Sequence, residues 1–225
     1  MSARTELEHI VRRHQTKAGA TERLPGSWIS KPMDQPSARR AAVLLLFGSD
    51  NGAALQPHSS AEELDLLFVT RAATLRKHAG QIAFPGGGID PEDDSPSAAA
   101  LREANEETGV ITGGIEVLGE LSEVELPVTN FLVTPVIGWW REECEVYAVD
   151  PGESQDVFRA PVSELLSPHN RLHAVVERGG RQFRGPAFDY EGRIIWGFTA
   201  IILDRLFTEL GWTRHWKSQR EIRMG

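Results

Sequence analysis

The sequence has very little cysteine: Cys144 is the only one among 225 residues. A single thiol cannot close an intramolecular disulfide, so a disulfide-stapled fold is excluded. The chain also lacks any apolar run of about 18 residues, and the sequence therefore predicts no membrane span. Residues 1–18 are strongly charged where a secretory leader would be apolar. We expect a cytoplasmic protein.

Positive charge is also in short supply, with 24 Lys and Arg against 32 Asp and Glu and a formal net charge of −8. This balance argues against a nucleic-acid or anionic-membrane partner. It leaves open a phosphorylated small molecule held by a metal ion and a few local basic groups.

Internal repeats and low-complexity linkers are absent, which favours one mixed α/β domain at 38–225, preceded by an N-terminal extension with a short helix at 1–37. Hydrophobic periodicity predicts the remaining elements. Helices are expected at Glu6–Lys17, Pro161–Leu166 and Ile194–Leu210. Strands are expected at Arg39–Phe47, Leu64–Thr70, Ile115–Glu123 and Asn130–Trp140, with a hairpin of Arg171–Val176 and Arg181–Phe188. Gly197, inside the last predicted helix, is expected to mark close packing.

The most informative stretch is Gly86–Val110, GGGIDPEDDSPSAAALREANEETGV, in which a glycine-rich loop and an acidic segment lead into a helix. Ser95 is suited to the N-cap and Pro96 to the first helical position. Gly109 stands where a left-handed residue ends the helix.

Glu103 and Glu107 are spaced i,i+4, so they project from one face of this helix. Like charges so placed repel each other by about 0.2–0.5 kcal/mol, and such a pair invites a cation. We expect Glu107 to face solvent and metal. Arg102 lies one turn before Glu106 and can hold its carboxylate.

Polar residues precede the glycine loop. His78 and Gln81 are either ordinary surface residues or part of a site, and their place just before the loop favours the site. The glycines allow backbone geometries closed to other residues and close approach of a ligand, with Gly87 at the centre of the triplet.

The spacing from Gly88 through Asp94 to Arg102–Val110 resembles the Nudix box: Gly, five residues, Glu, seven residues, then Arg-Glu-aliphatic-any-Glu-Glu-any-Gly-aliphatic. Asp94 departs from it, since the box has Glu there; Asp90, Glu92 or Asp93 could take over the role of that carboxylate. An EF-hand is disfavoured because DPEDD lacks that loop's alternating ligands and central glycine.

The preceding LLFVTRAATLRKHAGQIAFPGG is similar to the signature of the coenzyme A pyrophosphatase branch of this family, and the later IWGFTAIIL to its C-terminal helix. The resemblance implies a Nudix fold, which is a mixed β-sheet sandwiched between α-helices. It implies Mg²⁺ or Mn²⁺ at the box. It also implies hydrolysis of the pyrophosphate bond of coenzyme A or acyl-CoA, giving 3′,5′-ADP and a 4′-phosphopantetheine species.

Roles follow from the resemblance position by position. Glu103 and Glu107 are the expected metal ligands, with Glu106 sharing a further ion. Arg102 orients these carboxylates by salt bridges, and Glu153, in DPGES, is the expected downstream general base. Its rivals are Glu120, Glu123 and Glu125. The expected substrate contacts are Arg71, His78, Gln81 and Gly87.

Two other functions stay open at this stage: a Nudix pyrophosphatase acting on ADP-ribose or another nucleoside diphosphate derivative, and a non-catalytic nucleotide-sensing module. The intact row of three glutamates argues against the sensor. Tyr190 and Trp196 could stack on adenine, although core packing is the better interpretation for Trp196. Related enzymes suggest a homodimer, and the sequence leaves the oligomeric state open.

Overall fold

The computed structural model describes residues 1–16, 21–23, 37–49, 55–56, 58–74, 78–127, 129–178, 180–216 and 220–224. Its helices are α1 (Ala3–Gln15), α2 (Pro96–Thr108), α3 (Val162–Leu166) and α4 (Gly197–Glu209). The strands of the larger sheet are β1 (Glu22–Arg23), β2 (Arg39–Ser49), β3 (Leu64–Arg71), β4 (Ile82–Ala83), β5 (Gly86–Gly88), β6 (Ile115–Glu120), β7 (Val124–Leu126), β8 (Phe131–Trp140) and β9 (Ser154–Pro161). Those of the smaller sheet are β10 (Arg171–Arg178), β11 (Arg181–Tyr190), β12 (Arg193–Ile195) and β13 (Glu221–Met224).

The larger sheet is mixed and is centred on β2. This strand runs parallel to β8 on one side and antiparallel to β3 on the other, while β5 pairs with its first half. β9 completes the region by pairing with β3. The predicted mixed α/β architecture is therefore confirmed.

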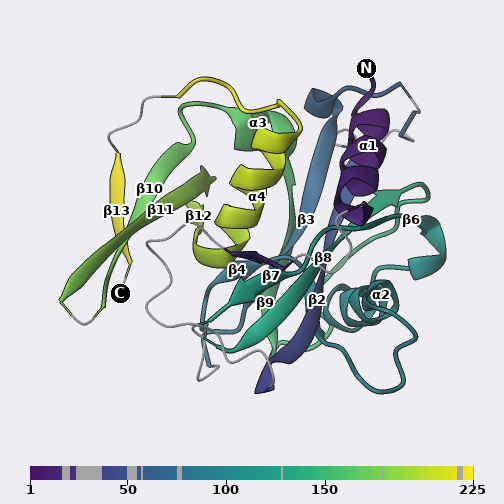
Figure 1. Ribbon diagram of the computed structural model, residues 1–225, viewed down its shortest axis with the longest axis horizontal. Helices are drawn as coiled ribbons and strands as arrows, with labels where there is room; N and C mark the ends of the chain where they lie inside the picture. The colour runs from purple at the N-terminus through teal and green to yellow at the C-terminus, as the bar shows by residue number, and fades with distance from the viewer. Residues whose placement is uncertain are drawn as a thin grey trace.

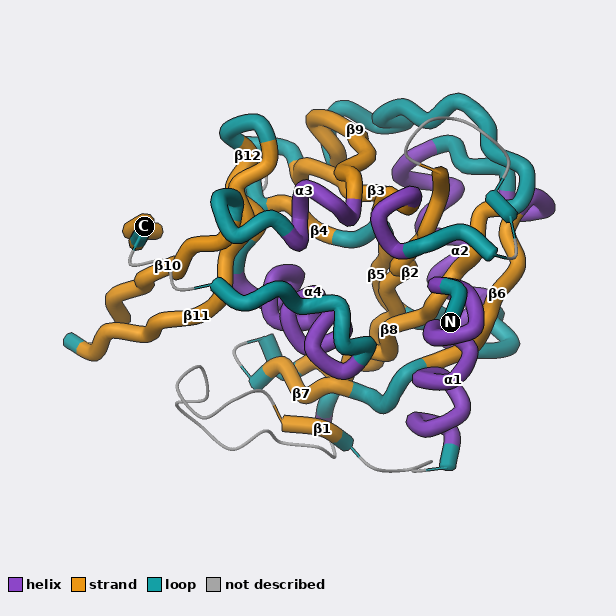
Figure 2. The backbone as a smooth tube through the Cα atoms, turned by 90° about the horizontal axis from the view of Figure 1, so that it is seen from above, coloured by secondary structure: helices purple, strands orange, loops and turns teal. Residues whose placement is uncertain are grey.

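Both faces of β2 are buried, which explains its nearly continuous apolar sequence. Because side chains alternate along a strand, Leu45 and Phe47 join one hydrophobic cluster with α1 and α4. Ala42 and Leu44 join a second cluster with α2. Figure 1 and Figure 2 show the result: α2 and α4 lie on opposite sides of β2 and β8.

The first helix belongs to the same core as the sheet. Leu7 and Ile10 of α1 are buried against it, so the helix of the predicted N-terminal extension packs on the main body. The division at residue 37 stays a prediction. The helix begins earlier than the sequence indicated and ends at Gln15; Lys17 and most of the predicted lead-in at 20–37 lie outside the described residues.

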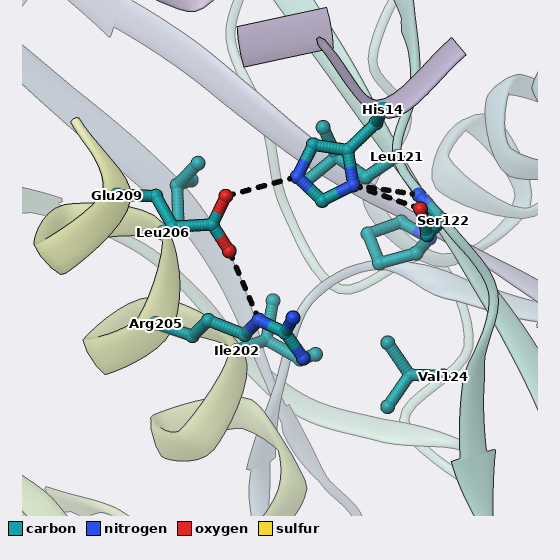
Figure 3. A pocket seen from close by; sticks show the side chains of 9 residues that line it. His14, Leu121, Ser122, Val124, Ile202, Arg205, Leu206 and Glu209 are labelled. Atoms are coloured by element: carbon teal, nitrogen blue, oxygen red, sulfur yellow. Dashed lines mark hydrogen bonds and ion pairs between the residues drawn. The ribbon is translucent and has the colours of Figure 1, made fainter. Parts of the chain in front are cut away.

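A small pocket lies where α1 meets α4, and Figure 3 shows that its polar groups contact one another. His14 Nε2 lies 3.1 Å from Glu209 Oε2, and the Ser122 main-chain N–H donates to His14 Nδ1 at 3.1 Å. Arg205 donates to the other oxygen of Glu209 at 3.0 Å. These contacts fasten α1 to α4.

The smaller sheet extends from the body as a hairpin of β10 and β11, with β13 alongside β10 and β12 alongside β11 (Figure 1). The predicted hairpin is confirmed, with Arg178 opposite Arg181 at its end. Trp196, at the N-terminus of α4, is half-buried and packs against the apolar cluster of this sheet, as its core interpretation anticipated.

Two predictions about residues 194–210 were wrong. Ile194 belongs to β12 and pairs with Asp189 of β11, so the helix begins only at Gly197. Trp196 is fully extended and Gly197 has φ +67°, a left-handed conformation that a glycine adopts without strain. A Cβ at Gly197 would meet nothing within 4 Å, so this glycine serves the chain's turn into the helix and not close packing.

The sequence of Asp150–Val157, DPGESQDV, favours a turn over its whole length, and this prediction was wrong for its second half, because residues 154–157 form the start of β9. In the part of the chain that is described, no helix is both long and apolar enough to cross a membrane.

Candidate active site

Helix α2 presents the carboxylates, and its ends match the sequence prediction. The Ser95 hydroxyl accepts from the Ala98 main-chain N–H at 3.1 Å, and Gly109 closes the helix with φ +69°. Ala100 and Ala104 are fully buried against β2, since their short side chains let the helix approach the sheet closely. This packing turns the glutamate face of α2 toward β5.

Glu103 lies directly against the glycine strand. A Cβ on Gly87 would fall 2.4 Å from the Glu103 carboxyl carbon, so only glycine leaves room for that carboxylate. Burial raises the pKa of Glu103, and the neighbouring Arg102 opposes the increase. Gly87 thus shapes the carboxylate site by having no side chain.

Glu107 is buried, with 7% of its surface exposed, and the expectation that it faces solvent was wrong. Its Oε2 accepts from the Gly86 main-chain N–H at 3.0 Å, and its Oε1 lies 3.9 Å from Arg71 Nη1. Burial, reinforced by the charges of Glu103 and Glu153, raises the pKa of Glu107 to about 7 despite Gly86 and Arg71. The site is therefore short of positive charge.

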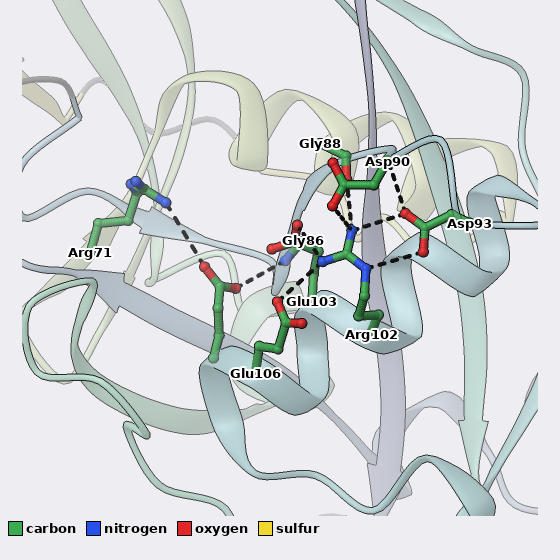
Figure 4. A network of polar contacts seen from close by, with 9 residues as sticks. Arg71, Gly86, Gly88, Asp90, Asp93, Arg102, Glu103 and Glu106 are labelled. Carbon is green, nitrogen blue, oxygen red and sulfur yellow. Dashed lines mark hydrogen bonds and ion pairs between the residues drawn. The ribbon is translucent and has the colours of Figure 1, made fainter.

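Arg102 joins the acidic loop to the helix, as Figure 4 shows. Its Nε and Nη2 donate to the two carboxylate oxygens of Asp93 at 3.1 and 2.9 Å. Its Nη1 donates to Glu103 and to Glu106, both at 3.1 Å. The predicted contact with Glu106 is confirmed, and one guanidinium fixes three carboxylates. The hydrogen bonds from Arg102 hold the pKa of Asp93 below its usual range.

Asp93 resolves the departure at Asp94. Asp94 is exposed, whereas Asp93 grips Arg102 with both oxygens and Asp90 lies 3.5 Å from the same guanidinium. Aspartate at position 94 is shorter than the glutamate of the Nudix box, and in this loop Asp93 makes the ion pair with Arg102. From the sequence alone, Asp93 was one of three candidates for this role, together with Asp90 and Glu92.

Glu153 lies in a tight turn that follows Val149. The Val149 main-chain N–H donates to the Glu107 carbonyl at 3.3 Å, so this segment passes the end of α2. The negative charge of Glu153, whose side chain is exposed, is among the causes that raise the pKa of Glu107.

The rivals of Glu153 have other contacts. Glu120 accepts from the Ser97 hydroxyl at 2.7 Å, and Glu123 pairs with Arg40 at 2.8 Å. Glu125 is buried on β7 with 3% of its surface exposed. The assignment of Glu153 as the general base stays a prediction.

Three of the expected substrate contacts lie at the end of β3 and in the loop before β4: Arg71, His78 and Gln81. Residues 75–77 of this loop lie outside the described residues. The Arg71 main-chain N–H donates to the Gln81 carbonyl at 3.0 Å, which closes the base of the loop. His78 is exposed with φ +57°, and its Nδ1 lies 2.7 Å from Gln81 Oε1. The structure thus brings His78 and Gln81 together and turns Arg71 toward Glu107.

Tyr190 lies apart from these groups in ring contact with Phe158, at a centroid distance of 6.1 Å. The pocket at His14 likewise contains none of the predicted site residues.

The donor set fits a divalent cation that prefers oxygen. Glu103 and Glu107 have raised pKa values because their negative charge is buried and incompletely balanced, and a hard cation would relieve that imbalance. Within the described residues, no three acidic, His or Cys side chains are gathered as a ready set of metal ligands. Glu103 and Glu106 both contact Arg102.

The fold and these residues define a class: a mixed α/β enzyme with an oxygen-lined site suited to diphosphate chemistry. Residues 39–177 match the NUDIX domain. The chain belongs to the Nudix hydrolase family, which is a family of diphosphatases.

Individual relatives support this membership. A protein of Photorhabdus laumondii subsp. laumondii, called "Uncharacterized Nudix hydrolase NudL", is 40% identical over 161 residues, which cover 70% of this chain and 85% of the relative. Its namesake from Salmonella dublin is 37% identical over 218 residues, covering 93% and 97%. Among solved structures, a MutT/nudix family protein from Enterococcus faecalis has 17% identity and a TM-score of 0.48, covering 94% of this chain and 75% of that one.

Proposed function

We propose that this protein hydrolyses the pyrophosphate bond of coenzyme A or acyl-CoA, releasing 3′,5′-ADP and (acyl-)4′-phosphopantetheine. The observation that carries the proposal is the position of the coenzyme A signature. Its Arg71 guanidinium lies beside Glu107, and the Ala72 main-chain N–H donates to the Glu153 carbonyl at 2.8 Å. The loop that follows Arg71, which we call the signature loop, therefore begins beside the glutamates of α2 and contacts the turn of Glu153.

Glu103 and Glu107, with Glu106, are the proposed ligands of Mg²⁺ or Mn²⁺. When bound, the cation neutralises the diphosphate oxygens and lowers the pKa of a coordinated water. Arg102 keeps Glu103 and Glu106 oriented and joins them to the acidic loop through Asp93.

Glu153 is the proposed general base. Its carboxylate takes a proton from the attacking water, whose oxygen bonds to phosphorus as the bridging P–O bond breaks. The leaving phosphate keeps the bridging oxygen. We expect Arg71 to face the negative diphosphate and Gly87 to contact the substrate through its main chain. His78 and Gln81 are proposed to help position the substrate or the catalytic loop.

A product assay tests the substrate. The purified chain is incubated with Mg²⁺ or Mn²⁺ and, separately, with coenzyme A, an acyl-CoA, ADP-ribose and a nucleoside triphosphate, and the products are identified by mass. We expect 3′,5′-ADP from the first two substrates at the highest kcat/KM. Fast cleavage of ADP-ribose beside intact coenzyme A would contradict the proposal and support the other pyrophosphatase. No turnover of any substrate, with nucleotide binding retained, would support the sensor.

His78→Ala is the matching variant for this assay, because its exposed side chain can be removed without leaving a cavity. We expect a raised KM for coenzyme A and little change in KM for a slow nucleoside diphosphate substrate. His169→Ala, which alters another exposed histidine remote from the loop in sequence, is the control.

A further inference from the structure

Asp150 organises the turn that ends at Glu153. Its Oδ1 accepts from the Gly152 main-chain N–H at 2.7 Å. Its main-chain carbonyl accepts from the N–H groups of Glu153 and Ser154 at 3.0 and 2.9 Å. Pro151 has no N–H to offer. The main-chain N–H groups of residues 152, 153 and 154 thus all donate to Asp150. The bond from the Gly152 N–H to the Asp150 side chain is that of an Asx-turn, which aspartate favours.

The far side of the same turn is fastened to the signature loop. The Ala72 main-chain N–H donates to the Glu153 carbonyl, and Arg71 is paired with Ser154 where β3 meets β9. The register of the two strands shifts between Thr70 and Arg71, which is the irregularity that re-aims side chains at sheet ends. Ala72 and Ser154 are both buried, so this attachment is firm.

The near side of the turn is fastened to the catalytic helix. Val149 donates its main-chain N–H to the Glu107 carbonyl, and Asp150 is the next residue. The backbone of Glu153 is accordingly fixed at three points: the end of α2, the Asp150 turn and the loop that begins at Arg71. Figure 4 shows Arg71 on the side of the site opposite Arg102, where the signature loop begins.

We propose that Asp150 is a positioning residue: its carboxylate closes the turn that holds Glu153 against the site formed by α2 and the signature loop. The inference rests on the proposed function, in which Glu153 is the base. Asp150 is exposed and does not itself reach the reacting atoms, so it acts through the geometry of Glu153. The Glu153 carbonyl accepts from the Ala72 main-chain N–H, so the same turn joins the proposed substrate-binding loop to the proposed general base.

The test is a double-mutant cycle measured as kcat and KM for coenzyme A hydrolysis with Mg²⁺. Asp150→Ala removes the acceptor for the Gly152 N–H. It is expected to lower kcat by about 10- to 100-fold, as misplacement of a reacting group by about an ångström does, with KM changed by less than about twofold. Asp150→Asn keeps an acceptor oxygen and is expected to restore most of kcat. In a Glu153→Gln background, Asp150→Ala is expected to add less than about a twofold loss, because coupled residues are not additive.

Asp189→Ala is the matched control. Asp189 Oδ1 accepts from the Gly192 main-chain N–H at 3.1 Å in the turn between β11 and β12, so the control loses the same kind of contact in another turn. It also loses the ion pair of Asp189 with Arg220, which thermal unfolding accounts for. We expect its kcat to be unchanged. Thermal unfolding of every variant checks that the fold is retained.

Three results would overturn the inference: a wild-type kcat for Asp150→Ala, an Asp150→Asn variant as impaired as Asp150→Ala, or an equal loss from Asp150→Ala in the Glu153→Gln background. Failure of the proposed function looks different, because the wild-type chain would then leave coenzyme A intact, and the cycle would be run on the diphosphate that it does cleave. A Glu153→Gln variant with full kcat would refute both the base and its positioning.

Discussion

Replacing Glu107 by Gln is expected to stabilise the metal-free protein at alkaline pH while removing most of its turnover. Glu107 is buried, and its pKa rises from 4.5 to about 7 in the folded chain. Between these two values the folded state binds more protons than the unfolded state, so stability falls as the pH rises. A difference of about 2.5 pKa units corresponds to about 3 kcal/mol of stability, present below pH 4.5 and lost once the pH passes 7.

The amide introduced by the Glu107→Gln change would carry no charge and would still offer an oxygen to the Gly86 N–H. The variant should therefore lose much less stability than the wild type between about pH 5 and about pH 8.5. At the higher pH it should be more stable by about 2–3 kcal/mol, or about 5–10 °C in Tm for a chain of this size. Its kcat should fall strongly, because a neutral amide is a poor ligand for a hard cation.

The assay is thermal or urea unfolding in a chelator at both pH values, with turnover measured separately in Mg²⁺. Glu145→Gln removes an exposed carboxylate from the segment beside α2 and serves as the control, for which neither property should change. A wild-type stability that does not fall from the lower to the higher pH would refute the buried-charge argument. Near-normal turnover of Glu107→Gln would refute its assignment as a metal ligand.

Further predictions concern the glycine strand, the acidic loop and the α1–α4 contact. Gly87→Ala should lower kcat by at least about tenfold, since its Cβ would displace the Glu103 carboxylate; steady-state kinetics check this, and unchanged kcat would contradict the close contact. Asp93→Asn should reduce activity, and Asp94→Asn should not, because only Asp93 grips the guanidinium with both oxygens; equal effects of the two changes would be inconsistent with the loop geometry. Contacts with His14 and Arg205 lower the pKa of Glu209 to about 2, so these contacts stabilise the fold above pH 4.5 and their contribution is lost as the pH falls toward 2. Glu209→Gln should flatten that part of the acid-unfolding curve, and a curve identical to the wild type would count against the contact.

The local features of the catalytic helix were predictable residue by residue. The Ser95 cap, the Gly109 terminus and the Arg102–Glu106 contact all join residues within one turn of helix, so their geometry follows from the spacing alone. The strand of residues 39–47 was predictable for a related reason: a long apolar run bounded by polar loops is typical of a strand buried on both faces.

Elements whose form depends on distant partners were less predictable. Ile194 is as apolar as its helical neighbours, and it became part of β12 because β11 supplies a pairing partner and Gly197 turns the chain. Asp150–Val157 was assigned to a turn, and pairing with β3 made residues 154–157 part of a strand. Pairing partners far along the chain are not visible in a local pattern.

The reaction class follows from the order of the residues, because one helix and the loop before it hold most of the chemistry within 25 residues whose spacing fixes which side chains share a face. The remaining features of the site depend on the folded chain. Folding buried Glu107 under the glycine strand and thereby raised its pKa. It also selected Asp93 over Asp94 as the partner of Arg102, and it brought the segment that leads to Glu153 against the end of α2 through the contact of Val149 with Glu107. Burial and charge proximity depend on which surfaces pack together, and packing is a property of the folded chain as a whole.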